Sequence, residues 1–359
     1  MRNSLVRRYR VVLFISISAI IIINIKRIYS DLWAEVEMAG NENTLDRRFI
    51  ETTNPGNGQR IIERCPQHLD FLKDGIRRFR EKVFPGTLEF DIGQIQTQNL
   101  RRRILDQRCK ELGHNNSSSL GVTRVPSHLL VDDVHKFMFC QVRKVSSISW
   151  RRLLNDVITR DSSGTVKLRR LSSYSLAEQK ERVENYKKFV FVREPLLRVL
   201  SAWQDKFVNG FDKRMYERSF GELIVEKVRR NVDVIRGEGD LNITFAEFVK
   251  YLTTTILPGM ISTDVHWQSY NTRCMPCTTF YDYIGHFENV SREAEWILNQ
   301  INVKGVKWPS KAPATSIKFA QTQYGTLIES QRKALYNLYK NDYRLFGYSV
   351  DKLWNELGL

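Results

Sequence analysis

The segment that most constrains the fold is an apolar run that continues into a basic helix, "KFVFVREPLLRVLSAWQDKF" at residues 188–207. Its first five residues, Lys188 to Val192, predict a buried strand, because the run is short, apolar and rich in β-formers. Pro195 is typical of the first turn of a helix. Arg193 would then lie at the carboxyl end of the strand, where open α/β sheets bind ligands.

The predicted helix after this strand has two distinct faces. Four large apolar side chains share the face expected to pack on a sheet: Leu196, Leu200, Trp203 and Phe207. Arg198, Ser201 and Asp205 fall on another face at three- and four-residue spacing. A guanidinium and a hydroxyl can hold one phosphate between them, so Arg193, Arg198 and Ser201 are candidate phosphate ligands. A solvated charged face with local ion pairs is the alternative interpretation.

A second strand–loop–helix unit precedes the first. Lys136 to Val142 predicts a short strand and Ser149 to Ile158 an amphipathic helix. The loop between them contains Arg143, Lys144 and the serines 146, 147 and 149. Free N–H groups at a helix start bind anions, although an ordinary turn with serine caps has the same composition. Two such units in one chain favour a ligand with two separated anionic groups.

The rest of the chain from about Val131 alternates between strands and helices. Further helices are expected at 212–234, 244–253, 291–301 and 330–339, with a strand inside 278–287. The polar run 160–175 is predicted to be an exposed, flexible loop. This alternation predicts an α/β domain with a mainly parallel central sheet flanked by helices.

The N-terminus predicts a membrane anchor. Residues 11–25 are mostly apolar, with four arginines before them and Lys26 and Arg27 after them. This charge bias favours a cytoplasmic tail at 1–10, a signal-anchor transmembrane helix at 11–25 and a lumenal remainder. A cleaved signal peptide is the alternative, but no small-x-small site follows the apolar run. Residues 26–58 are interpreted as a stem, 59–130 as a helical lumenal part and 131–359 as the catalytic domain.

Charge and cysteines fit a lumenal enzyme with an acidic ligand. Lysine and arginine number 56 against 40 acidic residues, a net charge of +16, which suits anionic partners. Four of the five cysteines could pair in an oxidising lumen, and "CMPC" alone is weak evidence for zinc. Four asparagines lie in glycosylation sequons: Asn115, Asn116, Asn242 and Asn289. A lumenal domain rarely meets nucleic acid, so we expect no such partner.

The motifs give a specific resemblance. "FCQVRKVSSISWRR" at 139–152 is similar to "YCYVPKVACTNWKR", and "FVREPLLRVLSAWQDKF" at 191–207 is similar to "FVREPFERLVSAYRDKF". These are the donor-binding segments of the Golgi carbohydrate sulfotransferases of the HNK-1, chondroitin and dermatan group, which the chain resembles over roughly 131–348. Arg143 replaces a proline and Ile148 replaces a threonine whose hydroxyl would face the 5′-phosphate; the neighbouring serines can supply that hydroxyl.

The resemblance implies a P-loop-like nucleotide-binding domain and 3′-phosphoadenylyl sulfate as sulfonate donor, without a metal. It implies that residues 143–149 hold the 5′ end: Arg143, Lys144, Val145, Ser146, Ser147, Ile148 and Ser149. Lys144 would neutralise the leaving phosphate, while Arg193 and Ser201 hold the 3′-phosphate. His266, in a His-Trp pair that the family shares, is the candidate base, ahead of Asp264 and Glu288. A histidine that only supports the fold or holds the sugar is the alternative.

The resemblance also implies a single-pass type II Golgi protein that sulfates a glycan or proteoglycan, with chondroitin N-acetylgalactosamine O4 as the nearest likeness. Two other functions stay open. A relative that binds glycan or nucleotide without transfer is suggested by the altered first loop. A nucleotide-dependent kinase is disfavoured, since the sequence lacks the Walker lysine–serine pattern and an obvious magnesium carboxylate set.

Overall fold

The computed structural model describes residues 87–114, 125–162, 168–229, 241–256, 264–309 and 315–359. All of them belong to one compact unit, Phe84–Leu359. The expected cytoplasmic tail, anchor and stem at 1–58, and Cys65, lie outside the described residues. No helix within the described ranges is long and apolar enough to cross a membrane.

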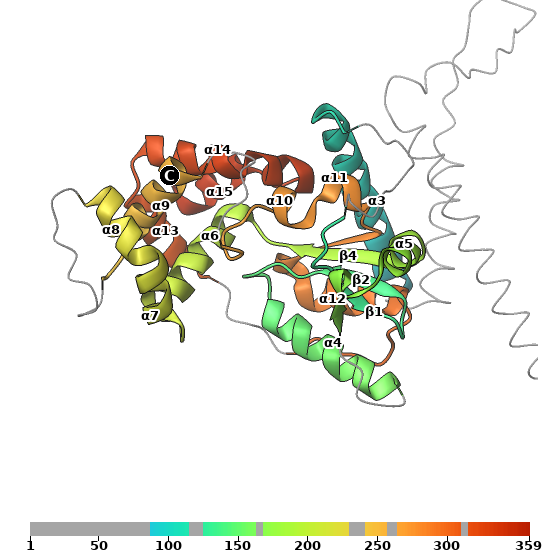
Figure 1. The fold of residues 1–359 in the computed structure, drawn as a ribbon. Coiled ribbons are helices and arrows are strands. Elements are labelled where there is room, and N and C mark those ends of the chain that lie inside the picture. The colour runs from blue at the N-terminus through green and yellow to red at the C-terminus, as the bar shows by residue number, and fades with distance from the viewer. Residues whose placement is uncertain (1–86, 115–124, 163–167, 230–240, 257–263, 310–314) are drawn as a thin grey trace, which may run out of the picture. The chain divides into compact units, whose positions relative to one another are not determined.

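A five-stranded sheet forms the centre of this unit, in the order β3-β1-β2-β4-β5 (Figure 1). Strands β2 (Phe137–Cys140), β4 (Lys187–Val192) and β5 (Tyr283–His286) are parallel neighbours. Strands β1 (Leu130–Asp132) and β3 (Arg169–Arg170) add antiparallel pairings at the other edge. The α/β class is confirmed, but the sheet is mixed rather than mainly parallel.

Helices cover both faces of the sheet because its central strands are apolar on both sides. Trp150 of α4 (Ser147–Asp161) packs on Phe139, Phe189 and Phe191, which point to one face. On the opposite face Cys140 forms a disulfide with Cys274 of α10 (Tyr270–Cys274). Figure 1 shows α4 and α12 (Val290–Gln300) on one side of the sheet and α10 on the other. This three-layer arrangement is typical of sheets that carry parallel strands.

A second apolar cluster is built mainly from helices and lies beside the sheet (Figure 1). Its helices are α6 (Pro195–Trp203), α8 (Glu222–Val228), α9 (Phe245–Thr255), α13 (Ile317–Gly325), α14 (Glu329–Phe346) and α15 (Val350–Leu357). Helix α6 starts directly after β4 and therefore connects the sheet to this helical cluster.

Most predicted elements are present, and some have different bounds. The predicted helices at 149–158, 244–253, 291–301 and 330–339 correspond to α4, α9, α12 and the longer α14. The predicted helix 212–234 is instead α7 (Lys213–Tyr216), a π-helical turn at Glu217–Gly221, and α8. Within the part interpreted as helical, 59–130, the structure describes one long helix, α3 (Thr87–Glu111).

The prediction of a flexible loop at 160–175 was wrong at its C-terminal end. Arg169 and Arg170 pair with β1 as an edge strand, and a 3-10 turn, Leu171–Ser173, follows. Helix α5 (Leu176–Asn185) then begins with Ser175 and Glu178 in a capping box. An edge pairing of two residues depends on the neighbouring strand, so the polar composition of the segment does not reveal it.

Two disulfides connect the helices to the sheet. Cys109 of α3 bonds Cys277 of α11 (Pro276–Thr279), and Cys140 at the end of β2 bonds Cys274. The four described cysteines are thus paired, as expected for an oxidising compartment. Helix α3 is also anchored to β5, since the side chain of Gln98 bonds both the N–H and the C=O of Ile284.

Candidate active site

The loop after β2 enters α4 through a backbone that leaves the start of the helix uncapped. Lys144 and Ser146 both have left-handed conformations, with φ of 66° and 53°. Each such non-glycine residue costs roughly 1–3 kcal/mol, and such strain is concentrated at functional sites. Ser146 occupies the N-cap position without forming a side-chain cap. The amides of the first turn of α4 therefore lack the usual serine acceptor and suit an anion.

The side chains of this loop differ in their exposure. Val145 and Ser147 are buried, and the buried hydroxyl oxygen of Ser146 has no hydrogen-bond partner among the described residues. Ile148 is 63% exposed, so the residue that replaces the expected threonine points outward. Arg143 and Ser149 are partly exposed. A buried hydroxyl without a partner and an uncapped helix start are both satisfied by a bound oxyanion.

Lys144 holds its ammonium group close to the π-helical turn that follows α6, Gln204–Val208. Its Nζ lies 3.3 Å from Oδ2 of Asp205, which also pairs with Lys206 at 3.2 Å. Burial lowers the pKa of Lys144, and the charges of Lys206 and Arg193 act in the same direction, while Asp205 opposes them. Lys144 is thus a partly buried cation. Its carboxylate partner, Asp205, also pairs with Lys206.

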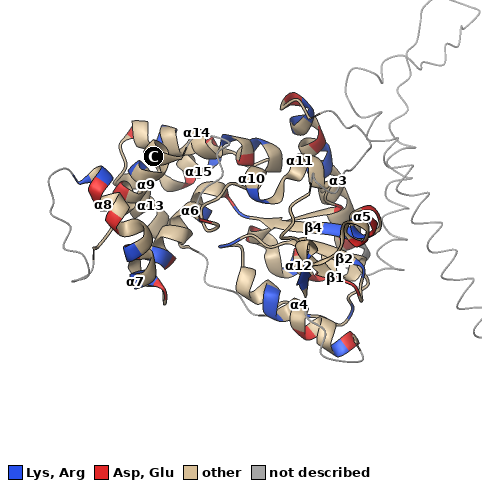
Figure 2. Ribbon diagram, in the orientation of Figure 1, with Lys and Arg blue, Asp and Glu red and all other residues tan. Residues whose placement is uncertain are grey.

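Arg193 is almost fully buried at the end of β4. Its Nη1 donates to the carbonyl oxygen of Lys144 at 3.3 Å, and its Nη2 donates to Thr315 Oγ1 at 2.9 Å. Its guanidinium lies 4.7 Å from the ring centre of Phe287. Burial lowers the pKa of Arg193 without a described carboxylate in salt-bridge contact. The two loops predicted to bind the ends of one ligand therefore meet in space. In Figure 2, basic residues colour the segments that follow both strands.

Arg198, by contrast, does not stand free to face a ligand. It is fully buried, and its two terminal nitrogens donate to the carbonyl oxygens of His266 and Gln268 at 3.1 and 2.6 Å. Its guanidinium lies 4.6 Å from the ring centre of Tyr270. Protein covers the Arg198 side chain, and Arg198 positions the 266–268 segment. Ser201, on the same helix, is partly exposed.

Glu194 of the Arg-Glu-Pro sequence is a structural residue. It caps α6 by accepting the N–H of Leu197 at 2.6 Å and the hydroxyl of Tyr343. Burial raises its pKa to about 7, against the opposing effect of these hydrogen bonds. The sequence Arg-Glu-Pro thus places one buried cation, one buried cap and one helix-starting proline in succession.

His266 forms a dyad with Asp264. The Nδ1 of His266 lies 2.7 Å from Asp264 Oδ1, and Tyr216 donates its hydroxyl to Asp264 Oδ2 at 2.9 Å. Burial alone would raise the pKa of Asp264, but the hydrogen bonds from His266 and Tyr216 outweigh it and lower that pKa. An ionised Asp264 keeps the proton on Nδ1 and leaves Nε2 with the lone pair that a general base needs. The remaining base candidate, Glu288, accepts the N–H of Glu194 and the hydroxyl of Tyr348 instead.

One chain of contacts connects this dyad to Lys144. Lys206 pairs with Asp205 and lies 4.6 Å from the ring centre of Tyr216, which in turn contacts His266. Lys206 and Tyr216 were not singled out from the sequence, because their spacing from Lys144 has no local signature. Thr315 and Arg273 were missed for the same reason: each reaches the site from a distant segment.

The described part of the chain holds no group of histidine, cysteine and acidic side chains suited to a metal ion. Among the four sequons, Asn242 and Asn289 are exposed, so a glycan could be attached there, whereas Asn115 and Asn116 lie outside the described residues.

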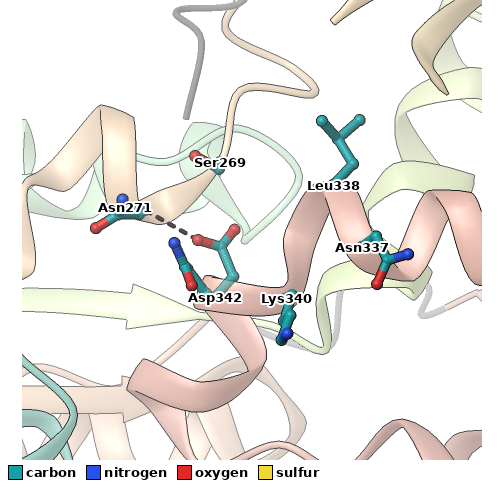
Figure 3. Close-up of a pocket in the computed structure, with 7 residues that line it drawn as sticks. Ser269, Asn271, Asn337, Leu338, Lys340 and Asp342 are labelled. Carbon is teal, nitrogen blue, oxygen red and sulfur yellow. Dashed lines mark hydrogen bonds between the residues drawn. The ribbon is translucent and has the colours of Figure 1, made fainter. Parts of the chain in front are cut away.

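A polar cavity of about 300 Å³ lies between the start of α10 and α14 (Figure 3). Its lining includes Ser269, Asn271 and Asp342, and none of the predicted site residues. Asp342 accepts the N–H groups of Tyr270 and Asn271 at 2.8 and 2.9 Å, and burial raises its pKa to about 6. The carboxylate therefore fixes the start of α10, close in sequence to the dyad.

Comparison with known proteins decides the family. The family model described as "Sulfotransferase family" matches residues 127–349, which contain both loops and the dyad. The chain belongs to this sulfotransferase family. It is therefore a sulfotransferase, its relatives indicate a carbohydrate acceptor, and membership implies 3′-phosphoadenylyl sulfate as the sulfonate donor.

Three relatives show the extent of the similarity. Carbohydrate sulfotransferase 11 of Rattus norvegicus is 30% identical over 81% of this chain and 87% of its own length. Carbohydrate sulfotransferase 10 of Homo sapiens is 32% identical over 69% of this chain and 73% of its own length. Carbohydrate sulfotransferase 9 of Homo sapiens is 30% identical over 71% of this chain and 60% of its own length. No solved structure matches the chain.

Proposed function

We propose that this sulfotransferase moves a sulfonate from 3′-phosphoadenylyl sulfate to a sugar hydroxyl of a glycan, with chondroitin N-acetylgalactosamine O4 as the first acceptor to test. The observation that carries the proposal is the contact between Arg193 and the carbonyl oxygen of Lys144 at 3.3 Å. It joins the loop after β2 to the end of β4, so one nucleotide can span both, as in a P-loop-like domain.

The residues present fit an anionic donor at both ends. At the loop after β2, the uncapped first turn of α4 and the buried Ser146 hydroxyl can accept a 5′-phosphosulfate. Arg193 is a buried guanidinium with no described carboxylate in salt-bridge contact, and it is suited to a 3′-phosphate together with Ser201. Arg198 positions the 266–268 segment in this proposal and is not a phosphate ligand.

Lys144 is the proposed electrostatic catalyst. When the acceptor oxygen bonds to sulfur, the sulfur–oxygen bond to the 5′-phosphate breaks and negative charge grows on that oxygen. An ammonium group held beside this oxygen stabilises the developing charge more strongly in a partly buried site than in water. Asp205 Oδ2, at 3.3 Å, holds Lys144 Nζ near the site.

His266 is the proposed general base, and Asp264 is its positioning residue. The Nε2 of His266 would take the proton of the acceptor hydroxyl, while Asp264 and Tyr216 keep the imidazole in the required tautomer. Every proton and bond is then accounted for: the hydroxyl proton goes to His266 and the sulfonate goes to the sugar oxygen. No metal is assigned a role in these steps.

The test is transfer of radiolabelled sulfonate by the lumenal part of the chain to chondroitin, dermatan and glucuronyl-lactosamine acceptors. We expect transfer by the wild type and its loss in Lys144→Ala, with Lys110→Ala, at an exposed lysine of α3, as the control. Wild-type donor binding without transfer to any acceptor would contradict the proposed reaction and favour the second candidate. That candidate, a glycan- or nucleotide-binding relative, is motivated by Arg143 and Ile148 in the first loop.

The cellular setting is part of the same proposal: a single-pass type II Golgi protein anchored through residues 11–25, with a stem at 26–58, a helical lumenal part at 59–130 and a catalytic domain at 131–359. The paired cysteines and the exposed sequons at Asn242 and Asn289 support a lumenal catalytic part. Removal of glycans by an endoglycosidase should increase the mobility of the expressed chain in a gel. A chain without glycans at all four sequons would speak against lumenal exposure.

A further inference from the structure

A group of basic side chains gathers beside the loop after β2. The basic cluster is defined here as His128, Arg143, Arg170 and Arg273. Arg273 comes from α10, Arg170 from the edge strand β3, and His128 from the segment that leads into β1. Only Arg143 belongs to the donor loop itself.

Two backbone features bring these distant segments together. The disulfide between Cys140 and Cys274 fixes α10 beside the end of β2, and Arg273 Nε donates to the carbonyl oxygen of Gln141 at 3.3 Å. On the other edge, Leu171 donates its N–H to the Leu129 carbonyl, which sets Arg170 beside His128. The Cys140–Cys274 disulfide and the pairing of β3 with β1 therefore hold in place the backbone segments that carry the cluster.

The charges of the cluster are uncompensated. No described carboxylate lies within salt-bridge distance of Arg143, Arg170 or Arg273, although the protein pairs many of its other cations. Burial lowers the pKa of Arg273 to about 10, and Arg143, Arg170 and Arg198 act in the same direction. Burial, together with Arg273 and Arg170, lowers the pKa of His128 to about 4, so His128 is neutral near pH 7. Like charges that are held together without acids favour a bound anion.

The position of Arg170 argues against the donor as its ligand. In the proposed function the donor extends from the loop after β2 towards Arg193 at the end of β4. β4 neighbours β2 on one side, whereas Arg170 lies on β3, beyond β1 on the other side. Arg170 therefore lies beyond the proposed donor path, and Arg273, which acts on His128 together with Arg170, can join it in holding a second anion. In the proposed function that second anion belongs to the acceptor.

We propose that Arg170 and Arg273 form a subsite for an acidic group of the glycan acceptor, a uronic carboxylate or a sulfate already present on the chain. This inference rests on the proposed function and specifies its substrate class: acidic rather than neutral glycans. Both guanidiniums can donate paired hydrogen bonds to a carboxylate or a sulfate. Arg143, the member of the cluster that precedes Lys144 in the chain, joins the acceptor subsite to the donor loop.

The experiment measures equilibrium binding of three polymers in the presence of the donor product, 3′-phosphoadenosine 5′-phosphate. The polymers are unsulfated chondroitin, carboxyl-reduced chondroitin 6-sulfate and carboxyl-reduced unsulfated chondroitin, which carry a carboxylate, a sulfate and no acid. The proteins are the wild type, Arg170→Gln, Arg273→Gln, Arg273→Lys and Arg169→Gln. Arg169 is the matched control, because it is the neighbouring exposed arginine of β3 and stacks on Tyr174 instead.

We expect the wild type to prefer at least one acidic polymer over the neutral one, and the polymer that it prefers identifies the group. Arg170→Gln and Arg273→Gln should each weaken that binding roughly ten-fold and leave the neutral polymer unchanged. Arg273→Lys should retain part of the preference and Arg169→Gln nearly all of it. Affinity for the donor product should not change.

Three results would overturn the inference. The wild type could bind the acidic and neutral polymers equally, or Arg170→Gln and Arg273→Gln could both keep the wild-type preference for the acidic polymer. The third is a loss of acidic-polymer binding in Arg169→Gln as large as in those two variants. A fall in donor-product affinity in place of polymer affinity would assign the cluster to the donor instead. None of these outcomes depends on turnover, so they are distinct from a failure of sulfonate transfer.

Discussion

At the scale of single residues, the dyad of His266 and Asp264 makes the sharpest prediction. Asp264→Asn should lower kcat by about 10²–10⁴-fold, because an asparagine can stabilise the wrong tautomer of His266 and cannot stabilise its protonated form. His266→Gln should lower kcat by a similar factor, and donor-product affinity should stay unchanged in both. Single-turnover transfer and calorimetric binding measure the two quantities. Full turnover in a folded His266→Gln variant would place the base elsewhere.

The matched control for the dyad is Tyr216→Phe. This change removes one hydrogen bond to Asp264 but keeps the ring that contacts His266 and Lys206. Its effect on kcat should be smaller than that of Asp264→Asn, roughly ten-fold or less. A larger loss in Tyr216→Phe would mean that the hydroxyl itself takes part in proton transfer.

Glu194 should make the stability of the fold depend on pH. Its folded pKa is about 7 against an ordinary 4.5, so the unfolded chain loses this proton first as the pH rises. The free energy of unfolding therefore falls between about pH 4.5 and 7, by up to roughly 3 kcal/mol from this group. Glu194→Gln removes the titration but keeps an acceptor for Leu197 and Tyr343. Denaturant unfolding at pH 5 and 7 should show a smaller decrease in the variant; an identical decrease would contradict this assignment.

At the scale of elements, α6 supports the segment that carries the dyad. Arg198→Lys keeps the charge but cannot reach both the His266 and Gln268 carbonyls, so we expect a loss of about 2–4 kcal/mol in unfolding free energy. The kcat should fall more than donor affinity, because the 266–268 segment moves while Arg193 and Lys144 stay. Leu223→Ala, on an exposed part of α8, is the control. Equal losses of donor affinity and kcat would instead make Arg198 a donor ligand.

The elements also show how far sequence patterns predict structure. The strands at β2 and β4 and the helices after them were predictable, because apolar runs and helical spacing are local. Spacing placed Arg198, Ser201 and Asp205 on one face of the helix predicted after β4, but it could not tell that protein covers Arg198. The edge strand β3 was missed, since two arginines become a strand only through pairing with β1.

At the scale of the whole molecule, the site is assembled from segments far apart in the chain. The loops at 143–149 and 193 were predictable from motifs, because each is a local strand–helix junction. Arg273 and Thr315 were not, since their contacts with Gln141 and Arg193 depend on a disulfide and on chain packing. Asp264 was proposed as an alternative base; its Oδ1 lies 2.7 Å from His266 Nδ1, so the proposed mechanism gives it the role of orienting His266.

The claim on which the proposed function depends is that the loops after β2 and β4 bind opposite ends of one nucleotide. Calorimetric binding of 3′-phosphoadenosine 5′-phosphate and of adenosine 5′-phosphate, which lacks the 3′-phosphate, tests it directly. Arg193→Ala should bind both nucleotides with nearly equal, weak affinity, whereas Lys144→Ala should weaken both by the same factor and keep the preference for the first. An Arg193→Ala variant that retains the full wild-type preference for the 3′-phosphate would contradict the claim.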